Sequence, residues 1–353
     1  MKGILLHGGH GTRLRPLTHT GPKQLLPIAN KPMSEYCIES MKDAGVTEIA
    51  IIIGGIGAQK VKEYYGDGKK YGMKFVYVEQ DYPKGIAHAI KLCQDFIAND
   101  KFLVFLGDNI IQKSIKEFAI DFQESDAAAK ILLCEVDNPS RFGIADIKNN
   151  KILKILEKPK DPPTNLAVTG IYFLTPKIFD VIDHLKPSWR NELEITDALD
   201  DLLQQKNDIT FDIITDYWKD TGTPEDIINA NNEILSQMKP LFLGEKANDV
   251  KIDGRIIVYS GTKIEKNVKL IGPIIIGKNC IIGEHTELGP NISIGDNCSI
   301  VNSKISNSII MADCKISDCD NIIDSIVAYN SHIEKSKNKN KVFLLGEGTK
   351  ISI

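Results

Sequence analysis

A glycine-rich segment followed by basic residues is the first part of the sequence that could bind an anion. It runs from Gly8 to Pro16 (GGHGTRLRP), and Lys23 comes shortly after it. Glycines let a backbone approach a phosphate and direct its N–H groups at it, while Arg13 and Lys23 would add positive charge. The segment lacks the GK[ST] of a P-loop, and Leu14 stands where dinucleotide-binding loops carry a third glycine. Glycines alone also fit a tight turn, so the rest of the sequence must decide.

Two aspartates that follow apolar segments could hold a divalent cation. Asp108 comes after the apolar run Lys101–Leu106, and Asp220 lies in a polar stretch after Ile209–Ile214. Mg²⁺ prefers one or two carboxylates, with phosphate oxygens and water completing its octahedron. Either aspartate alone is more often a capping or turn residue. Their spacing by itself therefore does not assign the two aspartates as metal ligands.

Short apolar runs alternate with helical patterns in the first part of the chain. This alternation predicts an α/β fold with a doubly wound, mixed but mostly parallel, Rossmann-like sheet and helices on both faces. Ligands bind beyond the carboxyl ends of the strands in such sheets, and Asp108 follows one of them. The expected strands are Lys2–Leu6, Glu48–Ile53, Lys74–Val78 and Lys101–Leu106, and the expected helices are Ser34–Ala44 and Ala87–Ala98.

A six-residue repeat replaces this pattern after about residue 240. Aliphatic residues recur at every sixth position, which fits neither a helix nor an alternating strand and predicts a left-handed parallel β-helix. The steps from Ile300 to Ile305 and from Ile305 to Ile310 are one residue short, and Ile316 and Ile322 resume the period. The regular positions are Ile264, Leu270, Ile276, Ile282, Leu288, Ile294 and Ile300.

The repeat and a helical stretch before it divide the chain. The helix Glu225–Met238 ends just before Pro240, which marks a boundary. We expect a catalytic domain over residues 1–238, a hexapeptide-repeat β-helix over 250–335, and a tail over 336–353. The polar stretch Lys335–Lys341 is expected to be a loop, and Val342–Ile353 a final strand.

The cysteines indicate a reducing compartment. There are seven, an odd number, without a CxxC pair or zinc-ligand spacing. Cys280, Cys298 and Cys314 fall on one stack of the predicted β-helix and should point inward as free thiols. We therefore expect a cytoplasmic protein.

Charge and hydropathy exclude several partners. The formal net charge is −4, so there is no broad electrostatic reason to bind nucleic acid or an anionic membrane. No apolar stretch approaches the roughly 20 residues of a membrane-spanning helix. Any phosphate must be bound by a few placed Arg and Lys residues.

The whole segment Gly8–Met33 (GGHGTRLRPLTHTGPKQLLPIANKPM) resembles the signature of the sugar-1-phosphate nucleotidylyltransferases. His7 departs from the pattern, since the family usually has Ala or Ser there, and a packing role is expected for it. With the hexapeptide repeat, the chain is most similar to the long form of the glucose-1-phosphate thymidylyltransferases. The likeness continues in the family's order through Glu79-Gln80-Asp81, Gly85-Ile86-Ala87, Leu106-Gly107-Asp108-Asn109, Arg141-Phe142-Gly143, Glu157-Lys158-Pro159 and Trp218-Lys219-Asp220-Thr221-Gly222.

The resemblance implies an enzyme that joins a sugar 1-phosphate to a nucleoside triphosphate, with Mg²⁺ as cofactor and pyrophosphate as by-product. It implies Arg13 and Lys23 as catalytic residues and Asp108 and Asp220 as metal ligands. Arg190 and Trp218 are weaker second contacts. The implied nucleotide-binding residues are Gly8, Gly9, Gly11, Thr12, Arg13, Gln24, Gln80, Gly85 and Asp108, and the implied sugar-phosphate residues are Asn109, Gly143, Glu157, Lys158 and Val168.

The choice of substrates and a second activity stay open at this stage. Gln24 after Lys23 resembles the thymidylyl branch, so dTTP with glucose 1-phosphate is expected, with a UTP-dependent uridylyltransferase as the alternative. A β-helix with acetyltransferase activity is a further alternative, for which His285 and His332 are the available bases. A non-catalytic sensing homologue is disfavoured because Arg13, Lys23 and both aspartates are present. The β-helix is expected to assemble a homo-oligomer, a trimer or a multiple of it.

Overall fold

The computed structural model describes residues 1–8, 11–55, 57–335 and 349, and the chain divides into two compact units. Unit 1 comprises Met1–Gly11, Thr18–Leu25 and Met33–Asp220, and unit 2 comprises Thr12–Leu17, Leu26–Pro32 and Thr221–Ile353. Apart from Thr349, the final strand predicted over 342–353 lies outside the described residues. No helix in the described part of the chain is long and apolar enough to cross a membrane.

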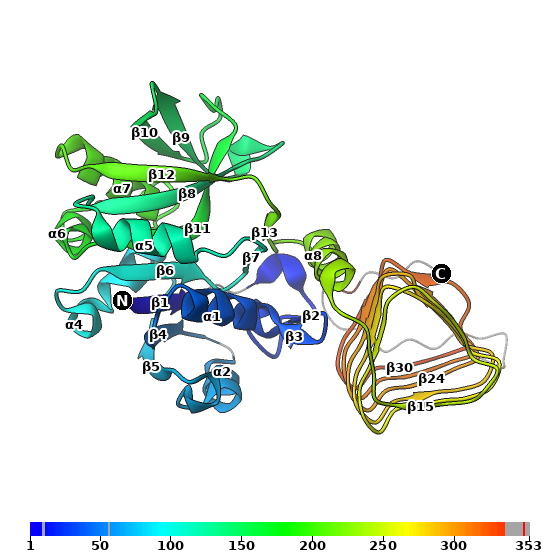
Figure 1. The fold of residues 1–353 in the computed structure, drawn as a ribbon. Coiled ribbons are helices and arrows are strands. Elements are labelled where there is room, and N and C mark those ends of the chain that lie inside the picture. The colour runs from blue at the N-terminus through cyan, green and yellow to red at the C-terminus, as the bar shows by residue number, and fades with distance from the viewer. Residues whose placement is uncertain (9–10, 56, 336–348, 350–353) are drawn as a thin grey trace. The chain divides into compact units, whose positions relative to one another are not determined.

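Unit 1 is built on a mixed sheet of nine strands (Figure 1). The mixed sheet was predicted, but it is not mostly parallel, because four of its strand pairs are parallel and four are antiparallel. The strand order is β10-β9-β11-β6-β1-β4-β5, with β8 pairing β11 and β12 pairing β8. The pairs of β1 with β4, β1 with β6 and β4 with β5 are parallel. The strands are β1 (Lys2–Leu6), β4 (Glu48–Ile53), β5 (Lys74–Glu79), β6 (Phe102–Leu106), β8 (Ala129–Glu135), β9 (Gly143–Lys148), β10 (Lys151–Glu157), β11 (Leu166–Leu174) and β12 (Ile209–Ile214).

β11 is the central strand of the antiparallel part of this sheet. That strand runs antiparallel to β6, β8 and β9, and its pairing with β8 shifts register between Val168 and Tyr172. Gly170 lies within this irregularity, and a Cβ there would stand 2.6 Å from a side-chain carbon of Leu106. Only a glycine lets β11 pass this close to the end of β6.

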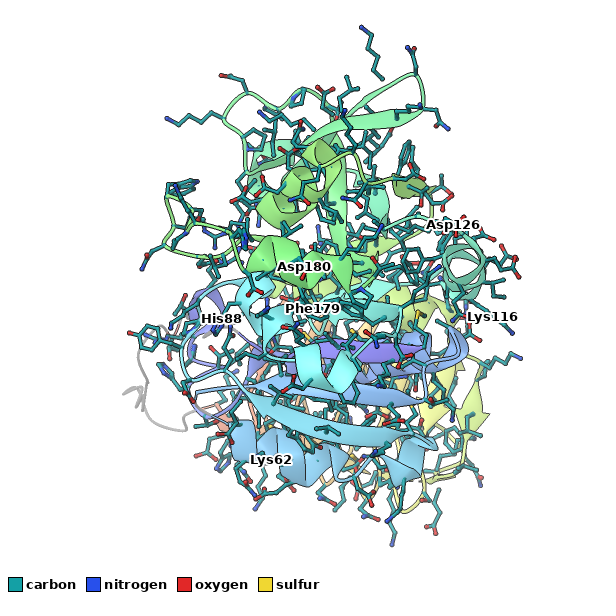
Figure 2. All side chains as sticks on the ribbon, turned by 90° about the vertical axis from the view of Figure 1, so that its left-hand side faces the viewer. Lys62, His88, Lys116, Asp126, Phe179 and Asp180 are labelled. Carbon is teal, nitrogen blue, oxygen red and sulfur yellow. The ribbon has the colours of Figure 1, made fainter. Side chains whose placement is uncertain are left out.

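Helices cover both faces of the sheet, which makes the fold doubly wound. One core cluster packs α3, α4, α6 and α7 against the strands, and a second packs α1, α2 and α5 against the other face. Phe179 of α6, labelled in Figure 2, stacks on Phe102 of β6 at 5.5 Å between ring centres. The helices are α1 (Met33–Asp43), α2 (Ala58–Tyr65), α3 (Ile86–Lys91), α4 (Gln94–Ile97), α5 (Lys116–Glu124), α6 (Lys177–Ile182) and α7 (Ile195–Gln204).

The single helix predicted over Ala87–Ala98 was wrong, because the segment forms two helices. The backbone N–H of Cys93 donates to the carbonyl of Ile90, which is the tighter spacing of a turn. Both helices still bury their apolar side chains in the same core.

Unit 2 contains three stacked parallel sheets, consistent with the predicted left-handed β-helix. Every third strand belongs to the same sheet. The first sheet holds β14 (Leu241–Phe242), β17 (Ile256–Val258), β20 (Ile274–Ile276), β23 (Ile292–Ile294), β26 (Ser308–Ile310) and β29 (Ile326–Val327). The second holds β15 (Glu245–Lys246), β18 (Lys263–Ile264), β21 (Ile281–Ile282), β24 (Ser299–Val301), β27 (Lys315–Ser317) and β30 (His332–Glu334), and the third holds β16 (Lys251–Asp253), β19 (Lys269–Ile271), β22 (Glu287–Leu288), β25 (Lys304–Ser306) and β28 (Ile322–Ile323).

The register of the coils follows the six-residue period and its two short steps. Ile264 pairs with Ile282 over a full coil, whereas Leu288 pairs with Ile305 and Ile294 with Ile310 over shortened ones. The repeating aliphatic side chains form one buried core. The shortened steps therefore preserve the inward direction of these residues.

Cys280, Cys298 and Cys314 stack on successive coils, as predicted, and all three are buried free thiols. Each thiol has a backbone carbonyl within 3.1 Å: Gly295 for Cys280, Met311 for Cys298 and Ala328 for Cys314. These weak hydrogen bonds satisfy the buried S–H groups.

Within unit 2, the outer face of the first sheet is covered by α8 (Pro224–Gln237) and by the hairpin of β2 (Pro27–Ile28) and β3 (Lys31–Pro32). Leu235 of α8 and Ala29 of the hairpin pack on Ile257 and Ile275. The side-chain oxygen of Asn231 accepts hydrogen bonds from the Ala29 N–H at 2.9 Å and from the Ser293 hydroxyl at 2.5 Å. The Asn30 amide also donates to the Ile294 carbonyl at 2.6 Å. These contacts thus fix the β2–β3 hairpin on the β-helix, and the hairpin closely follows Lys23-Gln24-Leu25 in the chain.

Candidate active site

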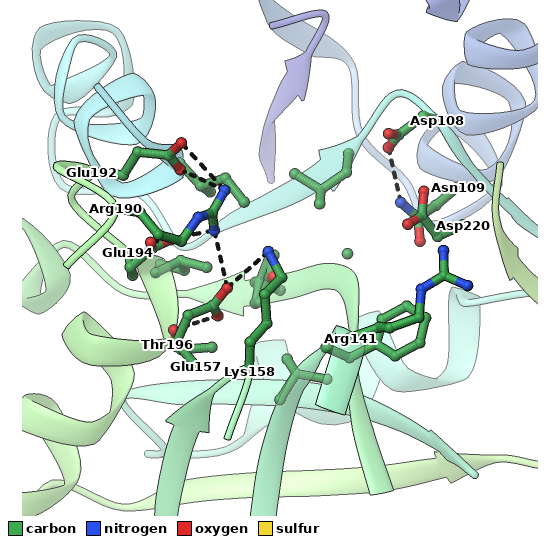
Figure 3. A pocket seen from close by; sticks show the side chains of 18 of the residues that line it. Asp108, Asn109, Arg141, Glu157, Lys158, Arg190, Glu192, Glu194, Thr196 and Asp220 are labelled. Carbon is green, nitrogen blue, oxygen red and sulfur yellow. Dashed lines mark hydrogen bonds and ion pairs between the residues drawn. The ribbon is translucent and has the colours of Figure 1, made fainter. Parts of the chain in front are cut away.

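A cavity of about 200 Å³ in unit 1 contains many of the predicted site residues (Figure 3). Its walls come from the carboxyl end of β6, from β11, and from the segments that follow β10 and precede α7. Every residue assigned to the sugar phosphate lines it, as do both candidate metal ligands: Asp108, Asn109, Gly143, Glu157, Lys158, Val168 and Asp220.

A short strand pair brings the two aspartates to the same wall. β7 (Asn109–Ile111) runs antiparallel to β13 (Trp218–Asp220), and Asp220 is opposite Asn109. The Asn109 amide donates to Asp108 Oδ1 at 3.0 Å, and its Oδ1 accepts from the Trp218 indole N–H at 2.9 Å. Trp218 is buried and positions Asn109, which in turn orients the Asp108 carboxylate.

Asp108 is also ion-paired with Lys23, and only 15% of its side chain and 11% of that of Lys23 are exposed. Burial by itself would raise the pKa of Asp108. The Lys23 ammonium and the hydrogen bond from Asn109 outweigh burial, so the pKa lies below its usual value. Asp108 is therefore a carboxylate at neutral pH.

The two aspartates suit a hard cation such as Mg²⁺. In the described part of the chain, no group of three or more His, Cys, Asp or Glu side chains gathers as a metal cage would require. Mg²⁺ does not need such a cage, because it usually takes one or two carboxylates and completes its shell with phosphate and water. A carboxylate has about four lone-pair sites, so Asp108 can keep its bonds to Lys23 and Asn109 and still bind an ion.

Glu157 and Lys158 form the opposite side of the cavity. Glu157 Oε1 lies 3.2 Å from both Lys158 Nζ and Arg190 Nη1, and Oε2 accepts from the Thr196 hydroxyl at 2.9 Å. Lys158 has a φ of 43°, in the left-handed region that non-glycine residues rarely adopt. This turn, just past the end of β10, aims the ammonium into the cavity (Figure 3).

Gly143 is required by packing at this site. A Cβ there would stand 2.5 Å from the methyl carbon of Thr196 and 3.5 Å from Glu157 Oε2. Any side chain would displace the threonine that holds Glu157. The missing side chain at Gly143 therefore leaves room for Thr196, whose hydroxyl donates to Glu157.

Arg190 pairs with three carboxylates, at 3.2 Å from Glu157, 3.1 Å from Glu192 and 3.3 Å from Glu194. Burial, followed by the charge of Glu157, raises the pKa of Glu194. Sequence reasoning gave Arg190 little weight and missed Glu194 and Thr196. The alternation of acidic and apolar residues just before α7 is the signal that could have indicated them.

A second group of predicted residues gathers beside β5. Gln80 is buried, and its Nε2 donates to the Gly85 carbonyl at 3.3 Å and lies 2.9 Å from His88 Nδ1. Gly85 has a φ of 102°, and a Cβ on it would stand 2.3 Å from the Leu193 carbonyl oxygen. The missing side chain thus makes room for the backbone of Leu193.

The glycine-rich segment is divided between the units. In unit 1, the Gln24 amide donates to the Gly8 carbonyl at 3.0 Å, and the Thr18 hydroxyl donates to the carbonyl of Gly11 at 2.8 Å. Thr12 and Arg13 belong to unit 2, in a 3₁₀ turn, Thr12–Leu14. There a Cβ on Gly222 would stand 3.2 Å from two nitrogens of the Arg13 guanidinium. Gly9 lies outside the described residues.

His7 is a buried packing residue. Burial lowers its pKa to about 3, so the ring is neutral near pH 7. Both ring nitrogens are buried, with no hydrogen-bond partner among the residues that the structure describes, and the ring packs edge-on against Tyr65. These surroundings favour packing over proton transfer.

The arrangement suits transfer between phosphates. Such reactions need in-line placement of the reacting groups and neutralisation of their charge. They do not need a covalent intermediate with the enzyme. The cavity offers two carboxylates on one wall, Asp108 and Asp220, which could hold a cation. On the other wall it offers the Lys158 ammonium and the Glu157 carboxylate, which can accept hydrogen bonds from hydroxyl groups.

Comparison with known proteins identifies the family. Residues 2–237 match the model described as nucleotidyl transferase, and residues 270–352 match the GMPPB C-terminal domain. A low-salt glycan biosynthesis nucleotidyltransferase, Agl11 of Haloferax volcanii, is 40% identical over all of both chains. A glucose-1-phosphate thymidylyltransferase of Streptomyces antibioticus is 37% identical over 100% of this chain and 99% of its own. A bifunctional protein GlmU of Methanococcus aeolicus is 36% identical over 94% of this chain and 79% of its own.

Solved structures of similar proteins agree with membership of the nucleotidyl transferase family. A Bacillus anthracis structure assigned as a glucose-1-phosphate thymidylyltransferase and solved with sucrose has a TM-score of 0.64 at 41% identity, covering 69% of this chain and 98% of its own. A UDP-glucose pyrophosphorylase solved with UDP-glucose has a TM-score of 0.60 at 30% identity, covering 67% of this chain and 99% of its own.

Proposed function

The chain belongs to the nucleotidyl transferase family, and on this premise we propose that it transfers a thymidylyl group from dTTP to glucose 1-phosphate. A phosphate oxygen of the sugar phosphate attacks the α-phosphorus of dTTP. The bond to the β-phosphate oxygen breaks, and the products are dTDP-glucose and pyrophosphate. The observation that carries the proposal is the cavity in which Glu157 and Lys158 face the wall of Asp108 and Asp220.

The sugar phosphate is assigned to the Glu157 side of the cavity. Lys158 pairs with the phosphate as a point charge, and Glu157 accepts hydrogen bonds from sugar hydroxyls. Asn109, Gly143 and Val168 form the remaining contacts or make space for them. The pairing of Lys158 with Glu157 in the structure supports this, because it holds the ammonium at the cavity before substrate arrives.

The triphosphate is assigned to the glycine-rich segment. The family resemblance assigns Gly8, Gly9, Gly11 and Thr12 to the phosphate oxygens, and within unit 1 the Gln24 amide donates to the Gly8 carbonyl. Arg13 and Lys23 neutralise the departing pyrophosphate. Gln80 and Gly85 contact the base. Asp108 and Asp220 would hold Mg²⁺, and the bound ion would neutralise charge on the phosphate oxygens.

The choice of nucleotide is tested with a matrix of four triphosphates against several sugar 1-phosphates. We expect kcat/KM for dTTP to exceed that for UTP, with UTP still detectable, because the two differ by one methyl and one hydroxyl group and a methyl group is worth only about 1–3 kcal/mol in a pocket. UTP is the second candidate, and the UDP-glucose pyrophosphorylase structure is what favours it. A strong preference for UTP or for any purine triphosphate would overturn the thymidylyl assignment.

We further propose that residues 1–238 carry the activity, in the cytoplasm, and that the β-helix assembles and stabilises the protein as a trimer or a multiple of it. Acetyl transfer by the β-helix is the less supported alternative. The His285 and His332 side chains are 64% and 61% exposed, and they lie 3.9 Å from Glu284 and 3.6 Å from Glu334, respectively. Turnover of acetyl-CoA would establish that alternative.

Truncation after Met238 tests this division of the chain. We expect the fragment to lose the full-length oligomer in light scattering and to melt at a lower temperature, while it keeps nucleotidyl transfer when assayed below that temperature. The lower stability follows because Leu235 and Ala29 lose their contacts with Ile257 and Ile275.

Leu235→Ala in the full chain is the matched control, since it weakens the same contact and leaves the β-helix in place. It should lower the melting temperature without changing the oligomer. A folded fragment that keeps the full oligomer, or that has no transfer activity, would contradict the proposed division.

A further inference from the structure

The buried amide of Gln80 is held in one of its two possible orientations. One side of the amide faces the Gly85 carbonyl at 3.3 Å and His88 Nδ1 at 2.9 Å. The Gly85 carbonyl can only accept, so the group facing it must be the NH₂, and the second N–H of that group points at His88. An amide turned the other way would place its oxygen against a carbonyl oxygen.

The ring of His88 can complete this arrangement only as an acceptor. Its Nδ1 must carry a lone pair, which means a neutral ring protonated at Nε2. Burial, and then the positive charge of Lys84, lower the pKa of His88 and favour this neutral form. His88 lies in the first turn of α3 (Figure 2), and this short helix begins directly after Gly85, so both acceptors belong to the same turn of the chain.

With its NH₂ held, Gln80 presents its oxygen on the opposite side. That oxygen lies toward the glycine-rich segment, where a Cβ on Gly8 would stand 3.5 Å from Oε1. No donor among the described residues occupies it. A base placed beside Gly8 therefore meets an acceptor rather than a donor.

We infer that His88 is a specificity-determining positioning residue, which fixes the Gln80 amide so that the site accepts bases with a hydrogen at ring N3. This inference rests on the proposed reading of the base by Gln80. Thymine and uracil carry an N3–H that the Gln80 oxygen can accept. Cytosine carries an unprotonated N3, which an oxygen repels, so discrimination against dCTP depends on the amide not turning over.

The test compares two substitutions of His88 by the ratio of kcat/KM for dTTP to that for dCTP. His88→Leu keeps the bulk and removes the acceptor, so the amide can turn, and we expect the ratio to fall about tenfold. His88→Asn places a side-chain oxygen close to the position of Nδ1, and we expect it to retain the ratio within about twofold. The loss in His88→Leu should appear in the KM for dTTP, with the KM for glucose 1-phosphate unchanged, which a general loss of folding would not produce.

Gln80→Ala separates failure of this inference from failure of the proposed function. If Gln80→Ala leaves the ratio unchanged, Gln80 does not read the base, and the assignment under the proposed function fails together with the inference. If Gln80→Ala abolishes the discrimination but His88→Leu does not alter it, only the role of His88 is overturned. Equal losses in His88→Leu and His88→Asn would also overturn it, because packing and not the acceptor would then be responsible.

Discussion

Replacing Asp220 by Asn is expected to lower nucleotidyl transfer on the order of a hundredfold or more, in a protein that remains folded. Asp220 lies opposite Asn109 in the β13–β7 pair, on the wall that also carries Asp108. Asn keeps the shape and can still coordinate through its oxygen, but it lacks the negative charge that a hard divalent cation requires. The defect should therefore include a higher Mg²⁺ concentration for half-maximal activity.

Asp108→Asn should have a similar effect on turnover, with an additional cost in stability. Its carboxylate pairs with the largely buried Lys23 ammonium, and neutralising one partner of a buried pair leaves the other charge uncompensated. Asp108→Asn should therefore also lower the melting temperature relative to the unaltered protein. Turnover and its Mg²⁺ dependence then report the loss of a metal ligand, and the melting temperature reports the loss of the pair with Lys23.

Asp216→Asn provides the matched control for both, since Asp216 is exposed in the segment that precedes β13. Its activity and its Mg²⁺ dependence should equal those of the unaltered protein. Near-normal turnover of either Asp108→Asn or Asp220→Asn at saturating Mg²⁺ would show that the metal assignment is wrong.

Lys158→Gln is the second substitution for which a large effect is expected. Its ammonium is assigned to the sugar phosphate, and a hydrogen bond to a charged group contributes about 1.5–3 kcal/mol, so kcat/KM for glucose 1-phosphate should fall between about tenfold and a hundredfold or more. The KM for dTTP should change little. Steady-state kinetics with each substrate varied in turn would measure both.

Lys160→Gln is a suitable control, because Lys160 is exposed and lies two positions further along the same segment. Lys158→Arg retains the charge and should recover part of the activity. An unchanged KM for glucose 1-phosphate in Lys158→Gln, or a defect confined to dTTP, would place the sugar phosphate elsewhere.

Several features of the fold could be predicted because they depend on neighbours in the chain. The strands β1, β4 and β6 are short apolar runs, as expected of strands buried on both faces of a parallel sheet, whereas β5 is a partly exposed strand at the edge. The six-residue period of the β-helix follows from one inward-facing side chain per side of each coil. The stacking of Cys280, Cys298 and Cys314 is a direct consequence of that period and of its two short steps.

The prediction of helix 87–98 failed because apolar periodicity does not report the hydrogen bond that ends a turn. The buried residues Ile90, Cys93 and Ile97 keep helical spacing across the segment, but the backbone tightens at Cys93 and a second helix begins at Gln94. Local spacing was sufficient to predict which side chains are buried and insufficient to predict one continuous element.

The resemblance identified candidate residues one by one, but the tertiary structure decided which of them meet. Asp220 reaches Asn109 only through two three-residue strands, which are too short to leave a pattern in the sequence. The Glu157–Arg190–Thr196 network and the Gln80–His88 contact likewise join segments whose pairing depends on the whole sheet. The sequence alone thus determined the element types and the strand end at which Asp108 stands, because those follow from local periodicity, whereas long-range pairing decided the partners of each charged group.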